Sequence, residues 1–240
     1  MNYVIATSRP WNEILAKRLE ESTGHRFYLI TFKEALTLDW LREINPRYVF
    51  FPHWSYRIPA EIHEAYECVI FHMTDLPYGR GGSPLQNLIL RGHTETKISA
   101  LRCSDVMDAG PIYMKQPLSL QGAASTIFVQ ATGVIESMIQ SIVKEEPVPT
   151  PQQGDPVIFE RRTPAQSDLT QAPIQSLNDF FDFIRMLDAE GYPQAFIDLH
   201  GHRIELSNVD IQNDRLTGNF VIYRHTQIPP ESAGGGKSGA

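Results

Sequence analysis

The stretch F-H-M-T-D-L-P-Y-G-R-G-G-S-P-L-Q-N, from Phe71 to Asn87, predicts a change from strand to loop to helix around which the chain is organised. Its apolar start indicates the end of a strand, and its Pro and Gly residues indicate a loop. Ser83 followed by Pro84 is typical of a helix start, because proline fits the first helical position. A second stretch, D-V-M-D-A-G-P-I-Y-M-K-Q from Asp105 to Gln116, indicates a loop between two hydrophobic strands.

Each stretch carries one residue that can take part in proton transfer, His72 in the first and Asp108 in the second. The 36 positions that separate them are enough for a loop, a helix and a strand. In a parallel sheet, such a unit brings the ends of neighbouring strands together, where α/β proteins form their sites. Taken alone, His72 is also explained as a strand-end histidine and Asp108 as a loop-capping aspartate. Asp105 is an alternative to Asp108 as the carboxylate that partners His72.

The chain before and after these stretches alternates between strand and helix patterns. Strands are expected at residues 3–7, 26–31, 48–51, 69–72, 97–103 and 112–117, and helices at 11–23, 36–44, 61–66 and 125–145. This alternation predicts an α/β fold with a mostly parallel sheet and helices on both faces. Ser8-Arg9-Pro10, after the first strand, does not form a G-x-G-x-x-G turn, which argues against a classical NAD site.

Three prolines, at 147, 149 and 151, mark the end of this first domain. A helix at 177–187 and strands at 195–199, 203–210 and 219–223 then predict a small α+β appendage, with Gly201 and Gly218 at turns. We therefore divide the chain into a catalytic domain at 1–150, a connector at 151–168, a C-terminal subdomain at 169–225 and a flexible tail at 226–240.

The composition excludes several classes of protein. The chain has 240 residues, 42% hydrophobic and 20% charged, as a soluble globular protein does. Its net charge of −7 argues against a nucleic-acid partner. No apolar run reaches the roughly 18 residues of a membrane span, and the N-terminus lacks a signal-peptide pattern. Two cysteines, Cys68 and Cys103, form neither a disulfide framework nor a metal motif, so we expect a cytoplasmic protein without a metal.

The two central stretches resemble the 10-formyltetrahydrofolate-dependent formyltransferases. His72 matches the family histidine, Thr74-Asp75-Leu76-Pro77 takes the place of the Ser-Leu-Leu-Pro loop, and Asp108-Ala109-Gly110 matches the Asp-x-Gly. Downstream, Phe159 to Pro164 and Gly191 to Phe196 resemble later motifs of the family, so that the resemblance covers roughly residues 45 to 210. It implies a Rossmann-like formyltransferase domain with a small C-terminal appendage.

The resemblance also implies the roles of individual residues. His72 would be the general base and Asp108 would stabilise its protonated form. The folate would lie against two loops, with the expected contacts Trp54, Tyr56, Ile58, Ser104 and Met107. The acceptor substrate would be held by Thr74, Asp75, Arg80, Gly81, Gly82 and Tyr192. Several of these have alternatives from the residues themselves: Trp54 and Tyr56 as caps of the core, Gly81 and Gly82 as ordinary turn residues, Asp75 as a turn residue and Tyr192 as a packing residue.

One position departs from the family pattern. The family asparagine two residues before the histidine falls on Ile70, which cannot donate a hydrogen bond to the formyl oxygen. We expect a backbone N–H or a water near His72 and Thr74 to take that role, ahead of a side chain such as Asn87.

The amino-acid sequence of the first stretch is similar to that of the sugar N-formyltransferases, one branch of this family. It implies transfer of a formyl group from 10-formyltetrahydrofolate to a nucleotide-linked amino sugar, with a UDP-linked 4-amino-4,6-dideoxy hexose of the pseudaminic acid route as the expected acceptor. The alternatives are another acceptor amine, such as methionyl-tRNA or hydroxyornithine, and a catalytically weak protein that binds folate or nucleotide sugar. The oligomeric state stays open, with a homodimer as one alternative.

Overall fold

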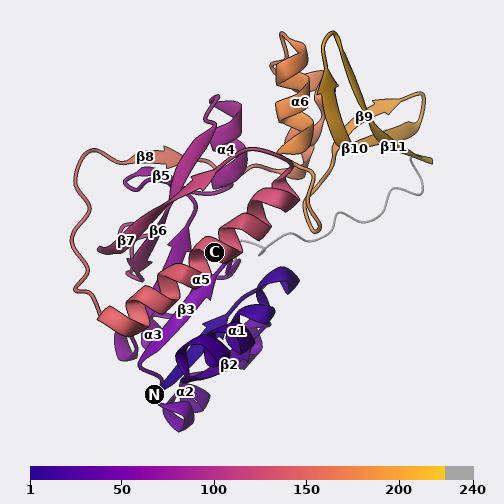
Figure 1. The fold of residues 1–240 in the computed structure, drawn as a ribbon. Helices are drawn as coiled ribbons and strands as arrows, with labels where there is room; N and C mark the ends of the chain where they lie inside the picture. The colour runs from indigo at the N-terminus through magenta and orange to yellow at the C-terminus, as the bar shows by residue number, and fades with distance from the viewer. Residues whose placement is uncertain (225–240) are drawn as a thin grey trace. The chain divides into compact units, whose positions relative to one another are not determined.

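A computed structural model of the chain describes residues 1–224, which form two compact units (Figure 1). The first unit contains residues 1–81, 96–118 and 129–158, and the second contains, among the described residues, 82–95, 119–128 and 159–224. The domain boundaries expected at 150 and 168 stay a prediction, and the tail expected at 226–240 lies outside the described residues.

The first unit is built on a six-stranded sheet. Its strands lie in the order β2 (Arg26–Ile30), β1 (Asn2–Ala6), β3 (Tyr48–Pro52), β4 (Cys68–His72), β6 (Glu95–Arg102) and β7 (Ile112–Ser119). The pairs β1–β2, β1–β3 and β3–β4 are parallel, whereas β4–β6 is antiparallel. The expected mostly parallel α/β fold is confirmed, but a parallel arrangement of β4 and β6 is wrong.

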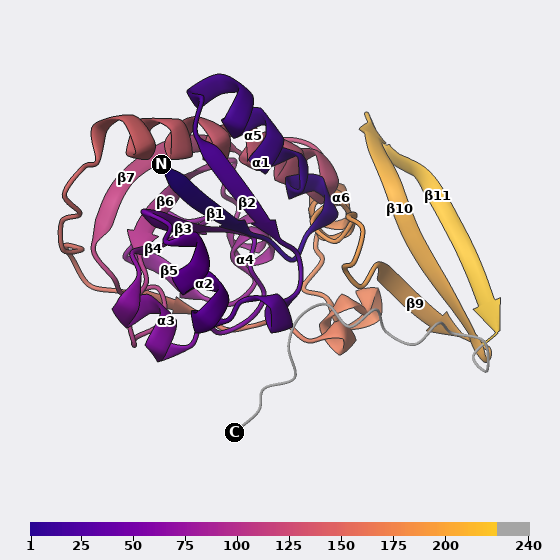
Figure 2. The ribbon, with the colours of Figure 1, turned by 90° about the horizontal axis from the view of Figure 1, so that it is seen from below.

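Helices cover both faces of this sheet, as expected (Figure 2). One face carries α1 (Ile14–Thr23) and α5 (Ala124–Glu145), and the other carries α2 (Leu38–Ile44) and α3 (Ala60–Ala65). The helix ends follow local sequence signals: the Thr37 hydroxyl accepts from the Trp40 N–H at the start of α2, and Gly24 adopts a left-handed conformation at the end of α1. Short 3-10 turns lie at residues 10–12 and 33–35.

Helix α5 is long and apolar enough to cross a membrane by length and composition. Half of its most apolar window is buried inside the protein, however, and the core helix of a globular protein meets the same criterion. Its buried side chains include Ile135, Met138 and Ile142, which lie on the stripe expected from the sequence.

The face of the sheet toward α2 and α3 holds a hydrophobic cluster. Its buried members include Val4, Val49, Phe51, Ile58 and Ile62. The partly buried residues Trp54, Ile70 and Cys103 pack against the same cluster. Residues of the expected folate loop and of the family-asparagine position therefore share one apolar environment.

The second unit combines two helices with a three-stranded antiparallel sheet. Helix α4 (Pro84–Leu90) begins at the expected proline, and α6 (Leu177–Arg185) begins with a capping box between Ser176 and Asp179. The sheet has the order β11 (Arg215–Arg224), β10 (His202–Gln212), β9 (Ala195–Leu199). Further 3-10 turns lie at residues 164–167 and 169–171.

Two local expectations are corrected. Gly218 is not at a turn but inside β11, where an added Cβ would lie 3.0 Å from the Ser207 carbonyl oxygen. The register shift between Ser207 and Asp210 on β10 brings that backbone close, so a larger residue at position 218 would push its neighbours aside. In addition, β5 (Tyr78–Gly81) pairs with β8 (Val157–Phe159) where only loop and connector were expected.

Arg185 joins separate segments of the second unit. Its side chain is 7% exposed, and Nη1 donates to the carbonyl oxygens of Leu120 (2.7 Å) and Gly122 (2.8 Å). Its Nε donates to Asp182 at 2.6 Å. A buried guanidinium is stable here because acceptors on two sides satisfy it.

We expect Arg185→Met to lower the free energy of unfolding by about 3 kcal/mol, because two carbonyl groups and a carboxylate lose their donor. Urea denaturation measures this loss. Arg215→Met, which removes an exposed arginine of the same unit, is the control and should change stability by less than about 0.5 kcal/mol. Equal effects of the two substitutions would contradict this account.

Candidate active site

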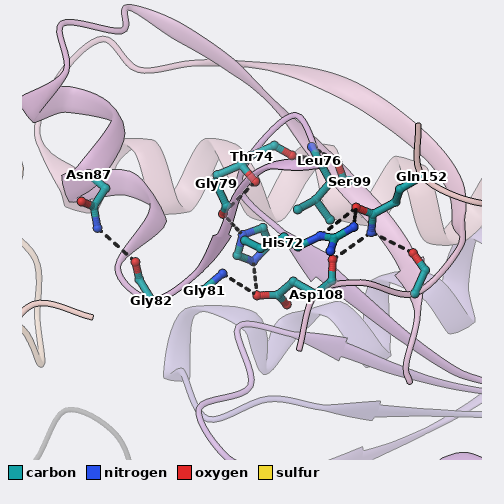
Figure 3. Close-up of polar contacts among 12 residues, drawn as sticks. His72, Thr74, Leu76, Gly79, Gly81, Gly82, Asn87, Ser99, Asp108 and Gln152 are labelled. Atoms are coloured by element: carbon teal, nitrogen blue, oxygen red, sulfur yellow. Dashed lines mark hydrogen bonds and ion pairs between the residues drawn. The ribbon is translucent and has the colours of Figure 1, made fainter. Parts of the chain in front are cut away.

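His72 and Asp108 meet in the first unit, as the sequence predicted (Figure 3). His72 is the last residue of β4 and is 8% exposed. Its Nδ1 lies 3.7 Å from Oδ2 of Asp108, and its Nε2 lies 2.7 Å from the carbonyl oxygen of Gly79. Because a carbonyl accepts only, Nε2 carries a proton, and the lone pair of the neutral ring therefore lies on Nδ1, beside the carboxylate.

The route by which the two residues meet differs from the expected one. His72 pairs with Ser99 and Val69 pairs with Arg102, so β6 ends beside the start of β4. Asp108 does not follow a neighbouring parallel strand end. It lies in the loop between β6 and β7, which returns toward His72.

This loop depends on an unusual backbone at Asp108 and Gly110. Asp108 has φ 53°, a left-handed conformation that costs a non-glycine residue about 1 kcal/mol. A Cβ added at Gly110 would lie 1.8 Å from the Arg102 carbonyl oxygen, so no other residue fits. The Gly81 N–H donates to Oδ2 of Asp108 at 2.9 Å and fixes the carboxylate that faces His72.

Asp75 and Thr74, two expected substrate contacts, are engaged within the loop after β4. Asp75 accepts from Lys115 (2.5 Å) and Lys97 (2.9 Å). Burial favours the protonated acid, but the hydrogen bonds from the two lysines outweigh it and lower the pKa of Asp75. The buried Thr74 hydroxyl donates to the Gly79 carbonyl oxygen at 3.3 Å, the same acceptor that His72 uses.

Arg80 and Gly81, also expected to hold substrate, lie on β5 beside Asp108. The Arg80 guanidinium donates through Nε (3.1 Å) and Nη2 (2.8 Å) to Oε1 of Gln152. The guanidinium is thus oriented by Gln152, a residue that also donates to the backbone of Asp108.

The remaining expected substrate residues, Gly82 and Tyr192, belong to the second unit. The Gly82 N–H donates to the Phe159 carbonyl oxygen at 3.0 Å. The Tyr192 ring stacks on Phe128 with 5.2 Å between ring centroids. This stacking supplies the packing role that the sequence left open for Tyr192, and their roles in substrate binding stay predictions.

The expected folate loop after β3 contains Trp54, Tyr56 and Ile58. Trp54 packs edge-on against Phe51 and Tyr56, and its buried indole N–H has no hydrogen-bond partner within residues 1–224. An unsatisfied buried donor fits a site that a polar ligand completes. Ile58 is buried in the apolar cluster beneath the loop.

The second expected folate loop follows β6. The Ser104 hydroxyl donates to the Val106 carbonyl oxygen at 3.0 Å, which shapes the loop. Met107 is 72% exposed and Val106 is 65% exposed, so the loop presents apolar side chains to solvent. A flat aromatic ligand would cover such side chains favourably.

His53, in the first of these loops, is tied into a buried polar chain. The Thr132 hydroxyl donates to Oδ1 of Asn12 at 2.7 Å, which orients the amide so that its Nδ2 donates to Nδ1 of His53 at 3.0 Å. The ring proton is then on Nε2, 3.4 Å from the Met73 sulfur. Burial, together with the charge of Arg9, lowers the pKa of His53 to about 4.

One polar residue of the site had no signal in the sequence. Gln152 donates from Nε2 to the carbonyl oxygens of Asp108 and Gly110, both at 2.8 Å, while its Oε1 accepts from Arg80. It lies in a proline-rich segment that predicts only a connector. Among the residues described, no group of three or more His, Cys, Asp or Glu side chains could hold a metal ion.

Comparison with known proteins places this geometry in a family. A family model for the methionyl-tRNA formyltransferase C-terminal domain matches residues 164–223. A solved structure described as a methionyl-tRNA formyltransferase from Clostridium thermocellum is 44% identical, covers 93% of this chain and 99% of its own, and superposes with a TM-score of 0.90. The chain belongs to the formyltransferase family. The predicted family and its Rossmann-like fold with a small C-terminal sheet are confirmed.

Other relatives of this formyltransferase are more distant. The methionyl-tRNA formyltransferase of Francisella philomiragia is 24% identical over 80% of this chain, which spans 64% of that relative's length. Two structures share the fold at TM-scores of 0.68 and 0.70: a sugar N-formyltransferase from a Shewanella species (14% identity, 87% of this chain and 97% of its own) and HypX from Aquifex aeolicus in complex with tetrahydrofolic acid (17% identity, 86% and 37%).

The His53 network predicts a pH-dependent stability. A lowered pKa means that the folded state favours neutral His53, so its contribution is present above the ordinary pKa of 6.5 and is lost as pH falls toward 4. Between pH 7 and pH 5 we expect the parent protein to lose about 2 kcal/mol of unfolding free energy that His53→Asn keeps. Asparagine does not titrate and tolerates the left-handed φ of 51° at this position.

Urea denaturation at both pH values measures this difference, with His202→Asn, at an exposed histidine, as the control. Identical pH dependence of the parent protein and His53→Asn would contradict the assignment.

Proposed function

We propose that the protein transfers a formyl group from 10-formyltetrahydrofolate to the amino group of a nucleotide-linked amino sugar. The observation that carries the reaction type is the buried His72–Asp108 pair within a chain of the formyltransferase family. The folate supplies the formyl group. The unsatisfied indole N–H of Trp54 and the exposed Met107 support a folate position between the loops after β3 and β6.

His72 is proposed as the general base. Nδ1 carries the lone pair, so it takes the proton from the attacking amine. The resulting imidazolium lies between two acceptors, the Asp108 carboxylate at 3.7 Å and the Gly79 carbonyl oxygen at 2.7 Å. The carboxylate thus faces the positive charge that forms on the ring during transfer, and the Gly79 carbonyl holds the ring in place.

The charge of the C-terminal part supports a sugar nucleotide over tRNA. Residues 164–223 contain three arginines and no lysine against nine acidic residues, a net charge of −6. Arg185 is buried and Arg203 is paired with Asp198 at 2.8 Å, which leaves little positive surface for phosphates. A domain that grips tRNA requires a basic face, because neutralisation of backbone phosphates dominates nucleic-acid affinity.

The second candidate is formylation of methionyl-tRNA. The name of the 44% identical structure and of the matching family model favours it. We give the negative charge of residues 164–223 more weight than the names of these two relatives. We therefore propose a UDP-linked 4-amino-4,6-dideoxy hexose of the pseudaminic acid route as the first acceptor to test. A cytoplasmic location accords with these soluble substrates and with the free thiols of Cys68 and Cys103.

The deciding experiment mixes the protein and 10-formyltetrahydrofolate with either the UDP-amino sugar or methionyl-tRNA. Tetrahydrofolate release and mass spectrometry of the acceptor detect transfer. Formylation of the sugar nucleotide supports the proposal. Formylation of the tRNA alone would replace the acceptor, and absence of transfer to any amine would favour a folate-binding protein without activity.

Asp108→Asn should lower kcat by about 10²-fold or more while the KM for the sugar nucleotide changes little, because an amide keeps the hydrogen bond from Gly81 but loses the charge that stabilises the imidazolium. His72→Asn should lower kcat by at least a similar factor. Steady-state kinetics measures both. Asp105→Asn is the matched control, since Asp105 is 78% exposed and pairs with His63. If Asp105→Asn were the damaging variant, the charge role would belong to Asp105.

Ile70→Asn tests whether the missing amide donor has been replaced. We expect kcat to stay unchanged or to fall, because another donor already serves the formyl oxygen and the asparagine would put a polar group against the apolar cluster at Ile70. The local candidate is a backbone N–H or a water near His72 and Thr74, because the single hydroxyl hydrogen of Thr74 already donates to Gly79. Asn87 is a poor candidate for this donor, because its Nδ2 already donates to three carbonyl oxygens.

Ile70→Val, which keeps an apolar side chain at the same position, is the packing control and should retain activity. A gain of about a hundredfold in Ile70→Asn would show that the natural protein lacks the donor.

A further inference from the structure

The side chain of Gln152 contacts both the loop of Asp108 and the side chain of Arg80. Its two amide hydrogens serve the carbonyl oxygens of Asp108 and Gly110, each at 2.8 Å. Its amide oxygen accepts twice from Arg80, at 3.1 and 2.8 Å (Figure 3). Every polar atom of the amide is therefore used, and the assignment of its nitrogen and oxygen follows from the partners.

The segment that carries Gln152 is itself anchored. Thr150 and Ile112 exchange backbone hydrogen bonds of 2.9 and 2.7 Å, which tie the segment to the start of β7. Ile112 follows the Asp108 loop directly in the chain. The amide is thus held at a fixed place beside the loop that it contacts.

The Asp108 loop needs such a contact more than an ordinary turn does. Asp108 has a left-handed φ, and the two carbonyl groups that Gln152 binds flank the turn from Asp108 to Gly110. Without donors for both, the peptide groups of this turn would be free to rotate, and the carboxylate would lose its direction toward His72.

The contacts close a ring of three segments. Gly81 on β5 binds the Asp108 carboxylate through its N–H, and the preceding residue, Arg80, binds Gln152 through its guanidinium. Gln152 then returns to the backbone of Asp108. Movement of the carboxylate away from His72 would have to break at least one of these charged or buried hydrogen bonds.

We infer that Gln152 is a positioning residue for the His72–Asp108 pair and for Arg80, an inference that rests on the proposed formyl transfer. The hydrogen bonds of Gln152 within residues 1–224 go to Arg80, Asp108 and Gly110 rather than to His72, and Gln152 takes no proton itself. It fixes the backbone from which the Asp108 carboxylate projects and the direction in which the Arg80 guanidinium presents its remaining N–H groups.

Two substitutions distinguish the donor contacts of the amide from its acceptor contact. Gln152→Met keeps the length of the side chain and removes every hydrogen bond. Gln152→Glu keeps an acceptor for Arg80 but replaces the NH2 group, and with it both N–H donors, by one oxygen that repels the carbonyl groups of Asp108 and Gly110. Gln153→Met, at the exposed neighbouring position, makes the same chemical change without these contacts.

The first measurement is steady-state kinetics with 10-formyltetrahydrofolate and the UDP-amino sugar. Misplacement of a catalytic group by about 1 Å can lower turnover by about 10²-fold. We expect Gln152→Met and Gln152→Glu to lower kcat by about 10-fold or more, with the KM for 10-formyltetrahydrofolate within about threefold of the parent value. Gln153→Met should match the parent protein. Normal kcat in Gln152→Met, or a fall in kcat that a smaller folded fraction explains entirely, would overturn the inference.

The second measurement does not depend on activity. In protein labelled with nitrogen-15 at histidine, the Nδ1 signal of His72, assigned with His72→Asn, reports the nearby carboxylate. We expect this signal to move in Gln152→Met and to stay in place in Gln153→Met, with both proteins folded by circular dichroism. An unmoved signal in Gln152→Met would overturn the positioning role.

The two measurements distinguish failure of the inference from failure of the proposed function. If the parent protein transfers formyl to no acceptor, the proposed function fails, and the His72 signal alone decides whether Gln152 positions the pair. If the parent protein is active while neither kcat nor the signal responds to Gln152→Met, only the inference fails.

Discussion

The antiparallel pairing of β4 and β6 is the constraint on which the candidate active site depends. Because His72 lies opposite Ser99, β6 ends at the far end of β4, beside Val69. The chain must then return along the sheet before Asp108 can face the imidazole. This return explains the left-handed backbone of Asp108 and the glycine at position 110, where the backbone of Arg102 leaves no space for a side chain. It also explains why the loop needs hydrogen bonds from two other segments: a loop that reverses beside its own strand has few neighbours in regular structure to satisfy its carbonyl groups.

Asp75 and Asp108 have different partners, and these partners give the two carboxylates different roles. Asp75 faces two lysine ammonium groups, and Lys115 also binds the Leu76 carbonyl oxygen, so Asp75 fixes the loop after β4 as a charged anchor. Asp108 instead accepts from one backbone N–H and faces one imidazole, without a fixed positive charge in the described contacts of its carboxylate. A carboxylate that already neutralises two lysines gains little from a newly formed imidazolium, whereas Asp108 gains a full opposite charge. The physical setting therefore supports Asp108 rather than Asp75 as the partner of the general base.

The sequence predicts the elements of the first unit well, because apolar runs such as Tyr48–Pro52 are bounded by proline, glycine and polar residues. It does not predict β5, since the pattern Tyr78-Gly79-Arg80-Gly81 is typical of a turn and becomes a strand only by pairing with a distant segment. The direction of β6 is likewise set by tertiary packing, which no local pattern records. His72 and Asp108 could be predicted from motif and spacing. Gln152 could not, because its role arises from contacts with residues 44 and 72 positions away in the chain.

Ile70 shows how the apolar core and the chemistry of the site are connected. Its side chain points to the same side of β4 as that of His72, two residues on, because side chains alternate along a strand. It packs on the cluster that also supports Trp54 and Cys103, at the base of the two loops where we place the folate. An asparagine there would have to leave its amide against apolar neighbours or turn it toward the ligand. The isoleucine lacks that donor but adds to the apolar cluster on which Trp54 also packs. A transition state is stabilised by donors that point at the developing charge and by a firm hold on the reacting groups. We therefore propose that a chain with Ile70 relies less on a side-chain amide at residue 70. It would rely more on the fixed position of the Asp108 loop, which Gly81 and Gln152 hold.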